Sequence, residues 1–245
     1  MTHKTIAIAC QGGGSHTAFT AGALKVMLRE LDPSRYRIVG LSGTSGGAMC
    51  ALLAWYGLLI GDRAKGAQLL DSFWGELAAA TPWDEMGNDV LVWLNRVRDR
   101  LILPEISPYW LPPLGQERLS DLLNKHVPFE RLQQLIGPDT PTLLVGAVDV
   151  LSGKFVVFRD DDPDPERRLS VGALLASAAI PSLFRATPVG DHLYWDGLFS
   201  ENPPIRDFVA GHQSVDAKPD EIWVIQINPE TAEAEPKTVK EIEDR

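Results

Sequence analysis

The sequence has 245 residues, of which 44% are hydrophobic and 23% are charged, and its formal net charge is -10 at pH 7. This length and balance predict one globular domain with a sizeable core. The acidic balance argues against a nucleic-acid groove, because phosphate binding relies on clustered lysine and arginine. It also disfavours simple electrostatic docking to an anionic membrane, whereas apolar contact with lipid depends on the local surface and stays open.

The two cysteines, Cys10 and Cys50, have neither a metal-binding spacing nor a disulfide pattern, so we interpret them as buried thiols in a reducing compartment. The apolar run over residues 6–10 is too short for the core of a signal peptide, and no stretch reaches the length of a membrane span. These features favour a cytoplasmic protein. Peripheral contact with a membrane and export without a cleaved signal stay open.

The N-terminal part of the chain repeats one order of elements. Residues 6–10 form an apolar strand-like run that stops at the glycines of "QGGG", and residues 15–31 then carry apolar side chains at helical spacing. "YRIVGLSGTSGGAMCALLAWYGLL" repeats this order, with a strand from about Arg37 to Leu41, a glycine-flanked turn and a strongly apolar helix. Two such units predict parallel strands buried between helices.

The next segment has a different character. Residues 62 to about 101 have an amphipathic helical pattern, and "ILPEISPYWLPPLG" then breaks it with four prolines. We interpret residues 62–115 as a helical, proline-rich and aromatic insertion that resembles a cap. Its aromatic residues, from about Trp83 onward and including Trp93 and Trp110, would line an apolar channel or touch a lipid surface, unless they are ordinary packing residues.

The remaining elements are shorter. We expect helices in "ERLSDLLNKHV", "FERLQQLI" and "LSVGALLASAAI", the last ended by Pro181, and strands in "TPTLLVGAVDVLSGKFVVFR", "HLYWDG" and "DEIWVIQINP". The charged run over residues 159–168 is interpreted as a solvated turn. Thr238 and Glu241 form a capping box for a helix that would stop after a few residues, which predicts that the chain is truncated at its C-terminus.

A serine between glycines is the first candidate for chemistry. Residues 43–47, "GTSGG", fit the G-x-S-x-G nucleophile elbow, and they lie between an apolar strand and an apolar helix as that motif requires. A sharp turn from strand to helix strains the serine backbone and brings neighbouring chain close, so Gly43 and Gly47 lack side chains. Ser45 is therefore the candidate nucleophile. The alternative is a small-residue turn needed only for close helix packing.

The glycine loop "QGGGSH" is the second candidate. Gly12, Gly13 and Gly14 stand between a strand and a helix, where successive backbone N–H groups can point into one cavity and bind negative charge. The loop lacks the G-K-[ST] ending of a P-loop and does not fit G-x-G-x-x-G. An oxyanion hole is favoured because a candidate nucleophile is present. A phosphate cradle and an ordinary tight turn are the alternatives.

The third candidate is a carboxylate. Asp196 ends an apolar strand and is followed by Gly197, and burial there would raise the pKa of the carboxyl group and make it a useful base. Many D-G pairs are only turns. A triad can also be drawn through Ser45, Asp149 or Asp196, and His212. None of the five histidines (His3, His16, His126, His192 and His212) has a distinctive setting, and the elbow lies too near the N-terminus for the usual α/β-hydrolase order.

Four motifs in order resemble the patatin-like phospholipases: the GGG loop, "GTSGG" about thirty residues later, "ASAAIPSLF", and a D-G pair followed by "ENPP". The resemblance spans nearly the whole chain and implies one domain over residues 1–245. The implied fold is α/β, a three-layer α/β/α architecture with a central, mostly parallel sheet, related to but distinct from the common α/β-hydrolase fold. The implied chemistry is hydrolysis of fatty-acyl esters of lipids through an acyl-enzyme, with a Ser45–Asp196 dyad, no histidine, oxyanion donors from Gly12, Gly13 and Gly14, and no metal or organic cofactor.

The chain departs from the family pattern at one place. The family loop usually reads G-G-G-x-[RK]-G, whereas this chain has His16 and Thr17 at the last two positions, which leaves loop geometry and substrate charge preference open. Two other functions stay open beside lipid hydrolysis. One is a module that binds lipid or a protein partner without turnover, and the other is a Ser-His-Asp carboxylesterase that uses His192 or His212.

Overall fold

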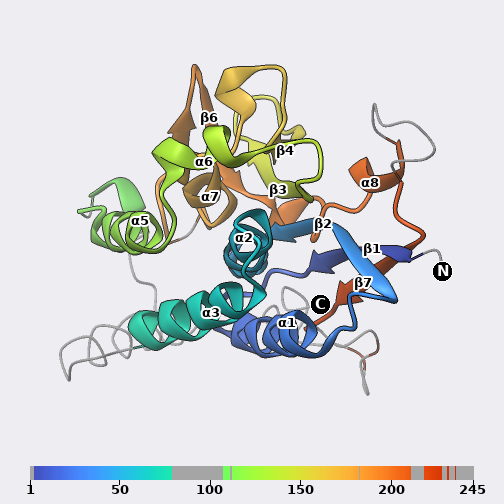
Figure 1. Ribbon diagram of the computed structural model, residues 1–245. Coiled ribbons are helices and arrows are strands. Elements are labelled where there is room, and N and C mark those ends of the chain that lie inside the picture. Colours follow the sequence, from blue (N-terminus) through green and yellow to red (C-terminus); the bar gives the residue numbers. More distant parts are fainter. Residues whose placement is uncertain are drawn as a thin grey trace.

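The computed structural model describes residues 3–78, 107–110, 112–181, 183–210, 218–227, 231 and 235 (Figure 1). Its strands are β1 (Lys4–Cys10), β2 (Tyr36–Thr44), β3 (Thr142–Asp149), β4 (Phe155–Arg159), β5 (Thr187–Val189), β6 (His192–Asp196) and β7 (Glu221–Ile225). Its helices are α1 (Ala18–Glu30), α2 (Gly46–Leu59), α3 (Arg63–Leu77), α5 (Leu114–His126), α6 (Phe129–Leu135), α7 (Val171–Ser177) and α8 (Asp207–Ala210). Short 3₁₀ turns are η1 (Gly14–Thr17), η2 (Pro108–Trp110), η3 (Pro165–Arg167) and η4 (Gly197–Phe199).

These strands form one mixed sheet. β3, β2, β1 and β7 lie side by side and run parallel, as the repeated strand-turn-helix order predicts. β4 and β6 run antiparallel to β3, and β5 runs antiparallel to β6. The predicted α/β class with a central sheet is confirmed, with antiparallel strands joined to a parallel centre.

Two strands share one edge of β3, and this arrangement creates the site. Val145 of β3 pairs with both β2 and β4, and Val148 pairs with both β4 and β6, so β2 and β6 must lie on the same edge, opposite β4. β2 ends with Thr44 opposite Gly146, and β6 arrives from the other direction and ends with Asp196 opposite Ala147. The C-terminal ends of β2 and β6 therefore meet head to head.

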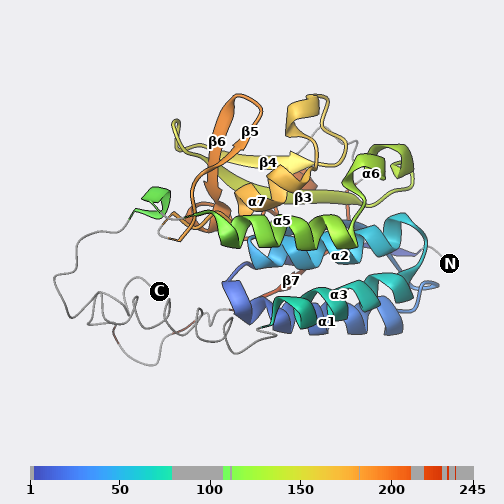
Figure 2. The same ribbon diagram turned by 90° about the vertical axis from the view of Figure 1, so that its left-hand side faces the viewer.

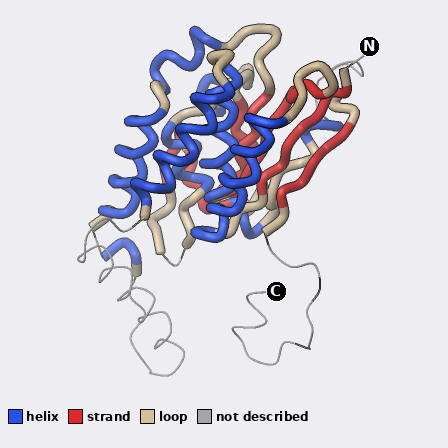
Figure 3. The backbone as a smooth tube through the Cα atoms, turned by 60° about the horizontal axis from the view of Figure 1, so that its bottom comes forward, coloured by secondary structure: helices blue, strands red, loops and turns tan. Residues whose placement is uncertain are grey.

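The sheet separates two cores, because side chains alternate between the faces of a strand. In β1, Ile6, Ile8 and Cys10 face the main core, whereas Ala7 faces a smaller cluster that contains Phe208 of α8. Figure 2 shows α1, α2, α3 and α5 stacked in front of the sheet, and Figure 3 shows this helical layer beside the strands. These helices, the sheet and α8 make up the three predicted layers.

The structure refines several predicted elements. Within residues 62–115, α3 packs against α1 and α2 with Phe73 fully buried, whereas residues 79–106, including Trp83 and Trp93, lie outside the described residues, as do His212, Thr238 and Glu241. The helix predicted to reach Pro181 ends at Ser177. No described helix is long and apolar enough to cross a membrane.

The charged run over residues 159–168 is not simply a solvated turn, so that prediction was wrong in part. Asp160 is only 3% exposed, and its Oδ1 accepts a hydrogen bond from the Leu143 N–H at 2.8 Å. Burial raises the pKa of this carboxyl group to about 7. The aspartate provides an acceptor for a backbone N–H at the start of β3, and composition alone does not reveal that role.

Candidate active site

Ser45 occupies the turn between β2 and α2. It is the one described residue other than glycine with a positive φ, at 55°, and this left-handed region strains the backbone of an L-amino acid. A serine that precedes a helix usually accepts a hydrogen bond from a backbone N–H of the first turn. The Ser45 side chain makes no such bond, while its carbonyl oxygen accepts from the N–H groups of Ala48 and Met49. The buried hydroxyl is therefore not used for capping.

The glycines on either side of Ser45 are required by close backbone contacts. A Cβ atom on Gly43 would lie 2.5 Å from the Ala48 nitrogen, and one on Gly47 would lie 2.3 Å from the Cys10 carbonyl oxygen. Neither position accepts a side chain without a backbone shift. The elbow geometry predicted from the pattern is thus present, and close helix packing accompanies it.

Asp196 lies at the facing end of β6 and is completely buried. Its Oδ1 accepts from the Leu198 N–H at 2.9 Å, whereas Oδ2 has no hydrogen-bond partner among the described residues. Burial raises the pKa of this carboxyl group to about 6, although the Leu198 N–H and the neighbouring Ser45 hydroxyl both act to lower the pKa. Such a carboxylate is ionised at neutral pH and is a better proton acceptor than an ordinary aspartate.

The histidines within the described residues lie in other surroundings. His192 is exposed and its Nδ1 lies 2.8 Å from Asp149 Oδ2. Asp196 comes four positions later in β6, a span of about 13 Å. His126 lies beside Glu76 at 3.3 Å. No described histidine forms a hydrogen bond with Ser45 or Asp196. The Asp149–His192 pair therefore does not belong to this site.

The glycine loop packs directly against the elbow. A Cβ atom on Gly12 would lie 2.3 Å from the Thr44 carbonyl oxygen and 3.1 Å from the Ser45 Cβ. The Gly12 N–H donates to Asn202 Oδ1 at 2.6 Å, and Asn202 Nδ2 donates back to the Gly12 carbonyl at 3.1 Å. Gly12 is thus held in place, and its N–H is already engaged.

The other two glycines of the loop differ from Gly12 in their hydrogen bonding. No described residue accepts from the backbone N–H of Gly13 or Gly14, and Gly14 has a positive φ of 56°. Thr17, which replaces the usual glycine, is buried and donates from its hydroxyl to the Gly14 carbonyl at 2.6 Å. His16 is exposed in η1. The departure from the family loop therefore adds a side-chain bond that closes this turn and leaves two glycine N–H groups without an acceptor among the described residues.

Two residues beside the site were not predicted. Asn202 holds Gly12, and Ser177 at the end of α7 accepts the Ser45 N–H at 2.9 Å. Both lie in segments that carry the family resemblance, "ENPP" and "ASAAIPSLF", but their spacing gave no role. The contacts span 190 and 132 residues of sequence, so a local pattern could not reveal them.

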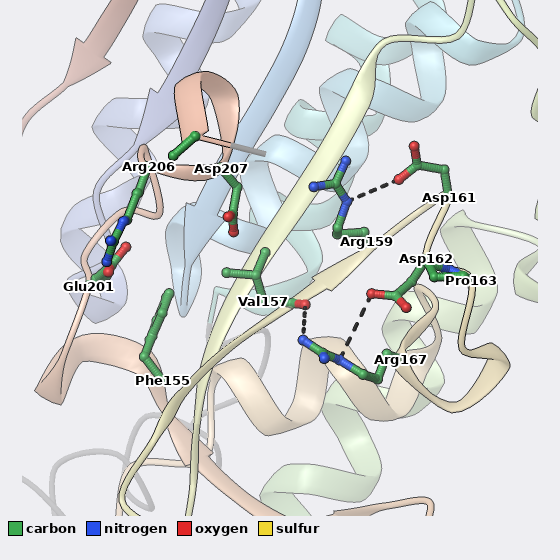
Figure 4. Close-up of a pocket in the computed structure, with 11 residues that line it drawn as sticks. Phe155, Val157, Arg159, Asp161, Asp162, Pro163, Arg167, Glu201, Arg206 and Asp207 are labelled. Atoms are coloured by element: carbon green, nitrogen blue, oxygen red, sulfur yellow. Dashed lines mark hydrogen bonds and ion pairs between the residues drawn. The ribbon is translucent and has the colours of Figure 1, made fainter. Parts of the chain in front are cut away.

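A surface cavity of about 780 Å³ lies apart from this site, between β4 and the chain leading into α8 (Figure 4). Two ion pairs border it, Arg159–Asp161 at 3.1 Å and Arg167–Asp162 at 3.9 Å. Neither Ser45 nor Asp196 lines it, and its arginines and carboxylates do not favour one sign of charge. We assign this cavity no part in the chemistry.

Among the described residues, no group of three His, Cys, Asp or Glu side chains is placed to hold a metal ion.

Comparison with known proteins places this arrangement in context. A family model described as Patatin-like phospholipase matches residues 8–209. The search of curated proteins gave no match. Among solved structures, VipD from Legionella pneumophila matches with a TM-score of 0.49 and 12% identity, over 91% of this chain and 49% of VipD. ExoU in its complex with SpcU from Pseudomonas aeruginosa matches with a TM-score of 0.36 and 21% identity, over 73% of this chain and 36% of that chain. This chain thus spans about half of the first protein and about a third of the second.

Proposed function

Because the chain belongs to the patatin-like phospholipase family, we propose that it hydrolyses fatty-acyl esters of lipids, with Ser45 as nucleophile and Asp196 as general base. One observation carries this assignment. The Ser45 hydroxyl is buried, unused by the helix that it precedes, and next to a buried carboxyl group at the same edge of β3.

In the first step, the Ser45 oxygen attacks the carbonyl carbon of the ester while Asp196 Oδ2 accepts the hydroxyl proton. Oδ2 suits this role because it has no other hydrogen-bond partner among the described residues. The negative charge that develops on the ester oxygen needs donors that are already oriented. The N–H groups of Gly13 and Gly14, together with that of Gly46 at the start of α2, are our candidates. Gly12 is set aside as a donor because its N–H is bound to Asn202.

In the second step, Asp196 returns the proton to the leaving alcohol, and an acyl group remains on Ser45. Water then takes the place of the alcohol. Asp196 accepts a proton from this water as it attacks the acyl carbon. When the bond between the acyl carbon and the Ser45 oxygen breaks, Asp196 gives this proton to the Ser45 oxygen, so the fatty acid leaves and both residues return to their starting state. These steps need only side chains and backbone N–H groups.

The direct test is hydrolysis of a short p-nitrophenyl acyl ester together with labelling by a fluorophosphonate probe, which reacts with activated serines. We expect Ser45→Ala to abolish labelling and to lower kcat by at least about 10³-fold, the usual effect of removing a nucleophile. His192→Ala is the matched control and should retain most activity, since His192 is bound to Asp149.

The same experiment separates the alternatives. A folded wild-type protein that neither hydrolyses the ester nor reacts with the probe would support a binding module without turnover. Loss of activity in His192→Ala would support a histidine-dependent carboxylesterase. Either result would contradict the Ser45–Asp196 dyad.

We further propose that the surface around η2 contacts lipid. The Trp110 side chain is 73% exposed, and Leu114 and Leu183 are also exposed apolar side chains. The Tyr109 carbonyl accepts a hydrogen bond from the Arg185 side chain, and the Tyr109 hydroxyl accepts one from the Ala186 N–H. These two residues follow shortly after Ala179, whose carbonyl accepts from the Asp196 N–H. Figure 2 shows η2, the short green helix on the left, at the opposite end of the described structure from α6. Exposed tryptophan beside apolar side chains is favoured at lipid interfaces.

Replacing Trp110 with alanine should therefore lower hydrolysis of phospholipid vesicles by about 10-fold, the loss expected when one large apolar side chain no longer enters lipid. Hydrolysis of the soluble p-nitrophenyl ester should stay unchanged. The control is Leu135→Ala, which removes an exposed apolar side chain at the end of α6. Equal changes on vesicles and on the soluble ester would argue against lipid contact by Trp110.

A further inference from the structure

The end of α7 touches both residues of the proposed dyad. Ser177 is fully buried, and its hydroxyl makes two hydrogen bonds: Oγ accepts from the Ser45 N–H at 2.9 Å and donates to the Gly146 carbonyl of β3 at 2.7 Å. Two residues later, the Ala179 carbonyl accepts from the Asp196 N–H at 3.0 Å. One short turn of chain therefore binds the backbone of the nucleophile and the backbone of the base.

The Ser177 hydroxyl lies at the point where the pairing of β2 with β3 ends. β2 pairs with β3 as far as Thr44 and Gly146, and the chain then turns away at Ser45 with its positive φ. After this turn the Ser45 N–H bonds to the Ser177 hydroxyl, and that hydroxyl in turn reaches the β3 carbonyl. The hydroxyl acts as a bridge that ties the strained elbow to the sheet.

We propose that Ser177 is a positioning residue for the reaction proposed above: its hydroxyl holds the Ser45 backbone at the orientation and distance from Asp196 that proton transfer requires. This inference rests on the proposed function. The Ser177 hydroxyl bonds to the backbone N–H of Ser45 and to the Gly146 carbonyl, so it acts on the nucleophile through the backbone. A small displacement of a nucleophile is enough to lower a rate strongly, because proton transfer and attack both need close alignment.

A purely structural role for Ser177 predicts different behaviour, and helix α7 offers a matched control. Ser170 caps the other end of the same helix, where its Oγ accepts from the Ala173 N–H at 3.1 Å, and it has no described contact with Ser45 or Asp196. Ser170→Ala and Ser177→Ala each remove one hydroxyl from α7. The first should lower the melting temperature by about 2–4 °C and leave kcat unchanged, as expected for the loss of a cap.

For Ser177→Ala we expect kcat for the p-nitrophenyl ester to fall on the order of 100-fold, with KM changed less than about twofold, because the loss concerns alignment and not ester binding. The rate of fluorophosphonate labelling at Ser45 should fall in parallel. Ser177→Cys retains a weak donor and acceptor of similar size, so it should recover about 10-fold of the lost kcat. The cysteine variant also provides a reading of kcat if the alanine variant fails to fold.

Three results would overturn the proposal, and they can be distinguished. If the wild-type protein reacts with the probe, and folded Ser177→Ala or Ser177→Cys reacts at the wild-type rate with unchanged kcat, Ser177 is only a structural residue and the dyad stands. If the folded wild-type protein does not react, the proposed function fails and the positioning role fails with it. A loss of kcat in Ser170→Ala equal to that in Ser177→Ala would also contradict a specific role of Ser177.

Discussion

Replacing Asp196 with asparagine should lower kcat/KM for ester hydrolysis by about 10³–10⁴-fold, because the amide cannot accept the Ser45 proton. The substitution leaves the other hydrogen bond of this side chain in place. The asparagine side-chain oxygen can still accept from the Leu198 N–H, which bonds to Oδ1 at 2.9 Å in the wild type. The loss would therefore report on the base itself, and fluorophosphonate labelling should fall with it.

The same substitution should stabilise the protein. Burial raises the pKa of Asp196 to about 6, which means that the folded state disfavours the charged carboxylate relative to the unfolded chain. At neutral pH this charge lowers the free energy of unfolding, and the uncharged asparagine should restore on the order of 1–3 kcal/mol. An active-site residue that reduces stability is expected where a charge must be held in a dry site for chemistry.

The stability difference between the two proteins and the activity of the wild type should both depend on pH, because both follow the ionisation of Asp196. Below about pH 3 the carboxyl group is protonated in the folded and unfolded states, so the two proteins should be equally stable there. As the pH rises from about 4 to about 6, the unfolded chain ionises while the folded protein stays protonated, so the wild type loses stability and the advantage of Asp196→Asn grows to its full size. Wild-type kcat/KM should be half-maximal at about pH 6 and level off at about pH 7, because the base must be ionised.

Urea unfolding followed by tryptophan fluorescence, at about pH 7.5 and about pH 4.5, measures the stability difference, and the other buried carboxyl groups cancel because both proteins carry them. A less stable Asp196→Asn at neutral pH would contradict the raised pKa of this group. Full ester hydrolysis by the variant would show that another group accepts the Ser45 proton.

Local pattern in the sequence was enough to single out the two candidate residues of the dyad. Glycines beside Ser45 and a D-G pair after an apolar strand indicate the elbow and the carboxylate, since each depends on a turn whose chemistry is written in neighbouring positions. The parallel strands follow likewise from the repeated strand-turn-helix order. These features are local, and periodicity together with turn residues predicts such features well.

The meeting of the two residues is not local. It depends on β2 leaving one edge of β3 at Gly146 and on β6 occupying the same edge from Ala147, and nothing within either strand indicates the shared edge. The same reason hides Ser177 and Asn202, whose partners are distant in sequence. The short strand β5 escaped prediction because it has three residues and contains a proline. Three residues are too few for strand propensity to indicate a strand, and a proline counts against one.

Gly12 provides the sharpest test of how the loop and the elbow fit together. Gly12→Ala would place a methyl group 2.3 Å from the Thr44 carbonyl oxygen, and this neighbour is backbone that cannot rotate away. The loop must then move off the elbow, which carries Gly13 and Gly14 away from the ester oxygen that we propose they stabilise. Misplacing such donors should lower kcat by about 10²–10³-fold. The crowding should also lower the free energy of unfolding by about 1–3 kcal/mol.

Gly22→Ala is the matched control for this prediction. Gly22 lies exposed within α1, and a Cβ atom there would meet no atom within 4 Å. Alanine is the better helix former, so this variant should gain about 0.5–1 kcal/mol in stability and keep its activity. The same chemical change should thus have opposite effects on stability at two glycines, and only the one beside the elbow should affect catalysis. If folded Gly12→Ala hydrolysed the p-nitrophenyl ester at the wild-type rate, the close approach of this loop to Ser45 would have no part in stabilising the oxyanion, and the donors would have to be sought at the start of α2.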